Sequence, residues 1–213
     1  MRLSRFESIY SLKKAIEIRM YFHDKNVIVV DLDGVLAGGE ERTPNERGIN
    51  ALELLYNAGY SFVLWTRGSN AEKDVDLFIA ENNLSCIFEL VICSENYTVG
   101  KYDNREIATR KDFEKVVNST IWLDLQERNK ILNEINILTQ NFEYFRYKIP
   151  KLFFAKYVMI DDDLRGTVID TKTCKLIVPE KYVPERICKI NTFTEKYVEA
   201  IQKYFIKSNG LIG

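Results

Sequence analysis

The chain has 213 residues, of which 46% are hydrophobic, enough for the core of one domain spanning residues 1–213. Its 30 basic and 31 acidic residues leave a net charge of -1, which excludes the strongly basic surface of a general nucleic-acid-binding protein. Four cysteines without a Cys-x-x-Cys spacing, with a single histidine, argue against zinc. No apolar run reaches the ~18 residues of a membrane span, so we expect no membrane partner and a cytoplasmic location.

The first predicted elements are a helix and a buried strand. Residues 4–20 form an amphipathic helix in this interpretation, because apolar side chains recur at spacings of three and four. Its expected inner stripe is Phe6, Ile9, Leu12 and Ile16. Residues 27–30 are four consecutive β-branched residues, a pattern typical of a short strand buried on both faces.

The next segments predict a helix followed by a parallel strand. Thr43 is the expected cap of a helix that runs to about Ala58, with Pro44 in its first position and Gly59 as its stop. Ile49, Leu52 and Leu55 form its expected inner stripe. Residues 61–66 then form an apolar strand. A strand, a helix and a strand in about 40 residues predict a right-handed crossover with parallel pairing.

The alternation of strands and helices continues to the end of the chain. A helix capped by Ser69 or Asn70 should bury Val75, Phe78 and Ile79, and strands are expected at 88–93, 157–160 and 174–178. Residues 94–156 are longer than one crossover requires and contain helical patterns at 106–117 and 126–139, so they predict a small insertion or cap. A final helix is expected over 194–207, with Gly210 past its end. The predicted fold is an α/β class, open three-layer α/β/α sandwich with a mostly parallel, Rossmann-like sheet.

Two aspartates follow the first predicted strand directly. Asp31 and Asp33 are two positions apart, so on extended backbone both carboxylates can face one crevice, and Gly34 then allows a sharp turn. Two like charges this close need a shared proton or a cation. Mg²⁺ suits carboxylate oxygens in an open crevice. The alternative interpretation is an exposed Asp-Leu-Asp-Gly turn, which is common after any strand.

Two further strands also end in polar residues. Thr66 and Arg67, followed by Gly68, come at the end of the 61–66 strand, and Asp161, Asp162 and Asp163 come directly after the 157–160 strand. The carboxyl ends of parallel strands meet at one edge of a sheet, where ligands bind in α/β folds. The coincidence of three such strand ends predicts a metal and phosphate site there.

The sequence resembles the haloacid dehalogenase superfamily of phosphotransferases over about residues 27–178. The resemblance is carried by Asp31-Leu-Asp33-Gly-Val, by the strand ending in Thr66, and by the acidic pair Asp161-Asp162. It implies that Asp31 is a nucleophile that becomes an aspartyl phosphate and that Asp33 is the general acid and base. It also implies phosphate binding by Thr66 with Arg67 and Gly68.

The same resemblance implies a metal site and a catalytic lysine. Mg²⁺ would be held by Asp31, Asp33 and Asp161 or Asp162. The lysine is the least defined part of the pattern: Lys111, in Arg-Lys-Asp at a predicted helix start, is the first choice, and Lys101 and Lys151 are its rivals. For any single one of them, a solvated surface lysine is the commoner interpretation.

The expected function is a magnesium-dependent phosphomonoester hydrolase that acts on a phosphorylated small molecule. A polynucleotide-end phosphatase is the alternative enzyme, because no large cap separates Asp31 from Thr66 and an open crevice admits bulkier esters. A non-catalytic metal- or phosphate-binding module of the same fold is the alternative from another class. The sequence leaves open the substrate, the oligomeric state and whether residues 94–156 form a lid.

Overall fold

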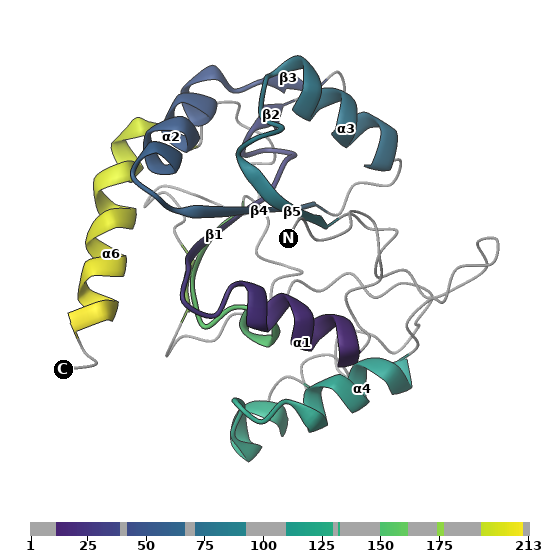
Figure 1. Ribbon diagram of the computed structural model, residues 1–213. Helices are drawn as coiled ribbons and strands as arrows, with labels where there is room; N and C mark the ends of the chain where they lie inside the picture. The colour runs from purple at the N-terminus through teal and green to yellow at the C-terminus, as the bar shows by residue number, and fades with distance from the viewer. Residues whose placement is uncertain are drawn as a thin grey trace.

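The computed structural model describes residues 12–38, 42–66, 71–92, 110–129, 132, 150–161, 174–176 and 193–210. These residues form an α/β fold around a five-stranded parallel sheet (Figure 1). The strands are β1 (Asn26–Val30), β4 (Ser61–Trp65), β5 (Phe88–Ile92), β6 (Lys156–Ile160) and β7 (Cys174–Leu176), in the order β5-β4-β1-β6-β7. The predicted α/β class with a mostly parallel sheet is confirmed, and β1 lies at its centre.

Helices cover both faces of this sheet. They are α1 (Leu12–Tyr21), α2 (Glu46–Asn57), α3 (Ala71–Glu81), α4 (Arg110–Ser119) and α6 (Val198–Gly210), with 3₁₀ turns η2 (Pro150–Leu152) and η4 (Glu195–Tyr197). Figure 1 shows α1 and α4 together on one side of the sheet and α2 and α3 on the other. None of the described helices is long and apolar enough to cross a membrane.

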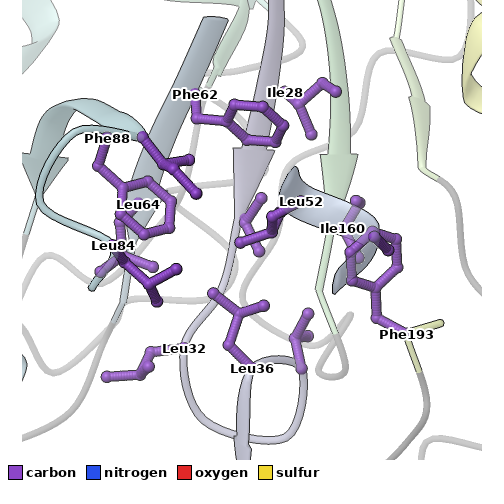
Figure 2. Close-up of a cluster of buried hydrophobic side chains, with 14 of the residues drawn as sticks. Ile28, Leu32, Leu36, Leu52, Phe62, Leu64, Leu84, Phe88, Ile160 and Phe193 are labelled. Atoms are coloured by element: carbon purple, nitrogen blue, oxygen red, sulfur yellow. The ribbon is translucent and has the colours of Figure 1, made fainter. Parts of the chain in front are cut away.

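Alternate residues of the central strands pack into two separate hydrophobic clusters, one on each face of the sheet. Val27 and Val29 of β1 pack with side chains of α1 and α4, whereas Ile28 and Val30 pack with side chains of α2, α3 and α6. Figure 2 shows part of the second cluster, in which Leu52 of α2 lies against the strands. Each fully buried aliphatic side chain contributes about 1.5–3 kcal/mol, so β1 is anchored from both sides.

The first helix buries a different stripe from the predicted one. Ile16 is 41% exposed, and the buried apolar positions are instead Ala15, Ile18 and Phe22. Phe22 lies beyond the predicted helix and packs edge-on against Phe154, with ring centroids 5.2 Å apart. Because Phe22 is anchored there, α1 is rotated so that Ile16 faces outward. Phe6 and Ile9 lie outside the described residues.

Two predicted helix ends were also wrong. Thr43 and Pro44 form β3, which pairs antiparallel with β2 (Ala37–Gly38), so the cap of α2 moves to Asn45. Gly59 ends α2 as predicted, with φ +88°. Gly210 is the last residue of α6 rather than a residue past its end.

Within the predicted insertion, part of the chain packs on the main sheet. Phe153 and Phe154 are buried in the same cluster as α1, and the ring centroid of Phe153 lies 5.7 Å from that of Trp65 in β4. The described part of the helix predicted at 106–117 is observed as α4, which runs on to Ser119, and residues 125–129 are helical at the start of the other pattern. The chain around η2 therefore belongs to the core beneath the sheet.

Asn45 joins three parts of the fold through one buried side chain. Its Oδ1 accepts the Gly48 N–H at 3.1 Å, and its Nδ2 donates to the carbonyls of Val35 at 2.8 Å and Phe193 at 2.9 Å. The side chain is 1% exposed. The turn after β1, the start of α2 and the segment before α6 are thus tied to one amide group.

We expect Asn45→Ala to lower the free energy of unfolding by about 2–4 kcal/mol, because it removes a helix cap and leaves buried carbonyls without a donor. Urea unfolding followed by circular dichroism measures this change. Asn57→Ala, at the exposed end of the same helix, is the matched control and should change stability by less than ~0.5 kcal/mol. Equal losses in the two variants would contradict the role given to Asn45.

A polar cluster joins α1 to β5 near the amino-terminal ends of the parallel strands. Glu89 of β5 accepts hydrogen bonds from Tyr21 at 2.7 Å and from Lys25 at 2.5 Å. Burial alone would raise the pKa of Glu89, but the hydrogen bonds from Lys25, Ser61 and Tyr21 outweigh it and hold that pKa below 4.5. For Lys25, burial opposes the charge, and the bond to Glu89 nevertheless raises its pKa above 10.5.

These shifts predict how stability depends on pH. The folded-state pKa of Glu89 is lowered, so its stabilising effect is complete above 4.5 and disappears as the pH falls through the lower folded value. We expect Glu89→Gln to cost about 1 kcal/mol near neutrality and much less at a pH well below 4.5. Chemical unfolding at both pH values tests this. The control is Glu53→Gln, at an exposed position of α2, and a pH-independent loss in Glu89→Gln would contradict the prediction.

Candidate functional site at the carboxyl edge of the sheet

Three polar residues come directly after neighbouring parallel strands. Val30 pairs with Leu64 on one side and with Ile160 on the other, so the chain leaves β1, β4 and β6 at the same edge. The ladder extends one step further, because the Asp31 N–H donates to the Ile160 carbonyl at 2.9 Å. Likewise, the Thr66 N–H donates to the Ile92 carbonyl at 2.9 Å. The structure therefore brings Asp31, Thr66 and Asp161 to one edge, as the strand pattern predicts.

Asp31 and Asp161 are neighbours on the same face of the sheet. Side chains alternate along each strand, and both aspartates continue the face of Val29 and Met159, which pack with α1. Adjacent strands lie roughly 4.8 Å apart, so the main chains of these two residues run side by side. Asp31 is 5% exposed and Asp161 is 2% exposed. Two buried carboxylates at this spacing require compensation by hydrogen bonds, a proton or a cation.

The turn after β1 fixes the Asp31 carboxylate. Its Oδ1 accepts the N–H of Leu32 at 2.8 Å. The Leu32 carbonyl in turn accepts the N–H groups of Leu36 and Ala37, each at 2.9 Å, and Gly34 has φ +82°. The buried Leu32 side chain holds this turn in the cluster shown in Figure 2. Asp31 is therefore presented by a rigid element rather than by a loose loop.

Asp33 has different surroundings from Asp31. Its side chain is 42% exposed, and its Oδ1 accepts the Nε–H of Arg42 at 3.0 Å. Arg42 Nη1 lies 3.7 Å from Oδ2 of Asp74, in the first turn of α3. The two carboxylates therefore differ: Asp31 is buried, whereas Asp33 is half-exposed and paired with the Arg42 guanidinium.

Arg42 is a functional candidate that the sequence did not reveal. It stands directly before β3 with φ +49°, a left-handed conformation that costs a non-glycine residue about 1–3 kcal/mol. No periodicity or motif marks this position, and the Thr-Pro pair after it read as a helix start. A contact between residues 33 and 42 becomes visible only once the β2–β3 hairpin folds back toward the turn.

A protein-family comparison gives this arrangement a context. The model of the family described as "Protein of unknown function (DUF705)" matches residues 4–171, well over half of the chain. The chain belongs to this family. The match corrects the resemblance to the haloacid dehalogenase superfamily, because the family that matches is a different one. No curated protein matches the chain.

The matched DUF705 region contains every described residue of the candidate site. Asp31, Thr66 and Asp161 all lie before residue 171, whereas α6 lies beyond it. Five other predicted residues are outside the described part of the chain: Arg67, Gly68, Lys101, Asp162 and Asp163. Lys111 is in the first turn of α4 and Lys151 is in η2, but their side chains are not among those described. Their roles stay predictions.

The described donors fit Mg²⁺ better than a metal that requires a full protein cage. Over the described residues, no group of three or more His, Cys, Asp or Glu side chains is placed to hold a metal ion. The buried pair of Asp31 and Asp161 supplies two carboxylates. Mg²⁺ commonly binds through one or two carboxylates and keeps several waters and substrate phosphate oxygens as its other ligands. The carboxylate pair meets that requirement.

Proposed function

We propose that this protein is a magnesium-dependent phosphomonoester hydrolase that acts through an aspartyl-phosphate intermediate. The observation that carries the proposal is the burial of Asp31 beside Asp161 at the carboxyl ends of adjacent parallel strands. Asp33, two residues on, supplies a second carboxyl group with access to solvent. A fixed buried carboxylate next to a reachable one is the arrangement that covalent catalysis with proton transfer requires.

The first chemical step is transfer of the phosphoryl group to Asp31. One carboxylate oxygen of Asp31 attacks phosphorus while the bond from phosphorus to the ester oxygen breaks. Asp33, in its protonated form, donates its proton to the departing oxygen, which leaves as an alcohol. The products of this step are the Asp31 acyl phosphate and the ionised Asp33.

The second step hydrolyses the acyl phosphate. Asp33 accepts a proton from a water molecule whose oxygen attacks phosphorus, and Asp31 is released as a carboxylate with inorganic phosphate. Thr66 lies at the end of β4 and would donate a hydrogen bond to a phosphoryl oxygen. Mg²⁺, held by Asp31, the Asp33 main-chain carbonyl and Asp161 or Asp162, would neutralise charge on the phosphoryl oxygens.

A substrate screen tests the proposal directly. Purified protein with Mg²⁺ is incubated with a panel of phosphorylated metabolites and with oligonucleotides carrying 3′ or 5′ phosphate ends, and released phosphate is measured. We expect turnover of small phosphomonoesters. Turnover of oligonucleotide ends alone would favour a polynucleotide-end phosphatase, and phosphate binding without any turnover would favour a non-catalytic binding module.

We also propose a finer description of the fold than its α/β class. Two hydrophobic clusters on opposite faces of a parallel sheet, each covered by helices, support an open three-layer α/β/α sandwich of Rossmann-like form. The site then lies where ligands bind in such sheets, outside the carboxyl ends of the strands.

A further inference from the structure

The proposed reaction leaves Arg42 without a role, although its guanidinium contacts the proposed acid. Arg42 Nε donates to Asp33 Oδ1 at 3.0 Å, and the Arg42 side chain is only 19% exposed. A guanidinium is planar and directs its N–H groups, so an arginine held in this way fixes the orientation of a carboxyl group. A mobile surface pair would not fix it.

Three separate elements meet at this guanidinium. The turn after β1 supplies Asp33, the β2–β3 hairpin supplies Arg42, and α3 supplies Asp74, whose Oδ2 lies 3.7 Å from Arg42 Nη1. The backbone of Arg42 is left-handed, at φ +49°, a conformation that glycine adopts without strain. Strained backbone of this kind persists where the surrounding structure holds it, and it is concentrated at functional sites.

We propose that Arg42 is a positioning residue for proton transfer by Asp33, and that Asp74 in turn holds Arg42. The inference rests on the proposed function. Because Oδ1 of Asp33 accepts the Arg42 N–H, the proton that Asp33 donates resides on its other oxygen. Arg42 thereby selects which oxygen of Asp33 faces the leaving group. In the phosphoryl-transfer step, which kcat/KM reports, this role matters only for esters whose leaving group needs a proton.

Two esters with different leaving groups test this role. A nitrophenyl phosphate loses a stable anion without protonation, whereas an alkyl phosphate must have its departing oxygen protonated. We expect Arg42→Gly to lower kcat/KM for the alkyl ester about 100-fold, the usual scale of acid catalysis, and for the nitrophenyl ester by less than ~3-fold. Glycine is the chosen replacement because it tolerates the backbone at this position.

A double variant tests whether the two residues act together. Asp33→Asn should show the same discrimination between the esters, and Arg42→Gly added to Asp33→Asn should cause no further loss. Arg42→Lys should recover only part of the alkyl activity, because an ammonium lacks the planar fork. Arg47→Ala is the matched control, since Arg47 pairs with Glu195 at 3.3 Å and not with Asp33, and both esters should react normally.

Each remaining outcome has a definite meaning. Equal losses on both esters, or additive losses in the double variant, would overturn the positioning role and leave the proposed function standing. Normal activity of Arg42→Gly on both esters would do the same. If the wild-type protein hydrolyses neither ester, the proposed function fails and the role of Arg42 fails with it.

Discussion

Asp31→Asn should reduce phosphomonoester hydrolysis by at least ~1,000-fold while the protein remains folded. Loss of a nucleophile costs an enzyme far more than loss of a binding contact, because the covalent route is closed. The asparagine side chain has the same size, and its carbonyl oxygen can still accept the N–H of Leu32 that Asp31 Oδ1 accepts. The expected loss is therefore chemical rather than structural.

Turnover and labelling experiments measure this effect. Wild-type protein quenched with acid during turnover of a substrate with a labelled phosphoryl group should carry the label, and hydroxylamine should release it because an acyl phosphate is cleaved by that nucleophile. Asp31→Asn should carry none. The control is Asp24→Asn, whose side chain is 94% exposed before the other end of β1. Near-normal turnover or labelling in Asp31→Asn would remove Asp31 from the mechanism.

The strands were predictable because their signals are local. The four β-branched residues at 27–30 and the apolar run at 61–65 have one stable placement, which is inside a sheet covered on both faces. Parallel pairing followed from the length of the connection between them. The carboxyl edge, with Asp31, Thr66 and Asp161, could therefore be located from the sequence alone.

The contacts around Asp33 could not be predicted in the same way. They depend on the β2–β3 hairpin, whose two strands have two residues each and leave no periodic pattern. Thr43 and Pro44 have the residue types of a helix start, and only tertiary pairing with Ala37 and Gly38 decides otherwise. For the same reason the rotation of α1 was missed: Phe22, the residue that fixes it, lies outside the helix pattern.

Removal of metal should abolish activity, and Asp161→Asn should lower the affinity of the protein for Mg²⁺. The phosphate dianion would approach a site that already contains Asp31 and Asp161, and without a cation these charges repel it. Excess chelator should therefore stop turnover, and added Mg²⁺ should restore it. Ca²⁺ should inhibit, because its longer and less regular coordination displaces the phosphoryl group from Asp31.

The contribution of Asp161 has its own measurement. Calorimetric titration of the protein with Mg²⁺ should show affinity lowered by at least ~10-fold in Asp161→Asn, since one of two described carboxylates loses its charge. Asp24→Asn should bind Mg²⁺ like the wild type. Full activity in excess chelator would exclude the metal from the mechanism. Unchanged Mg²⁺ affinity in Asp161→Asn, with activity still metal-dependent, would move the ligand to Asp162, the alternative that follows Asp161 in the sequence.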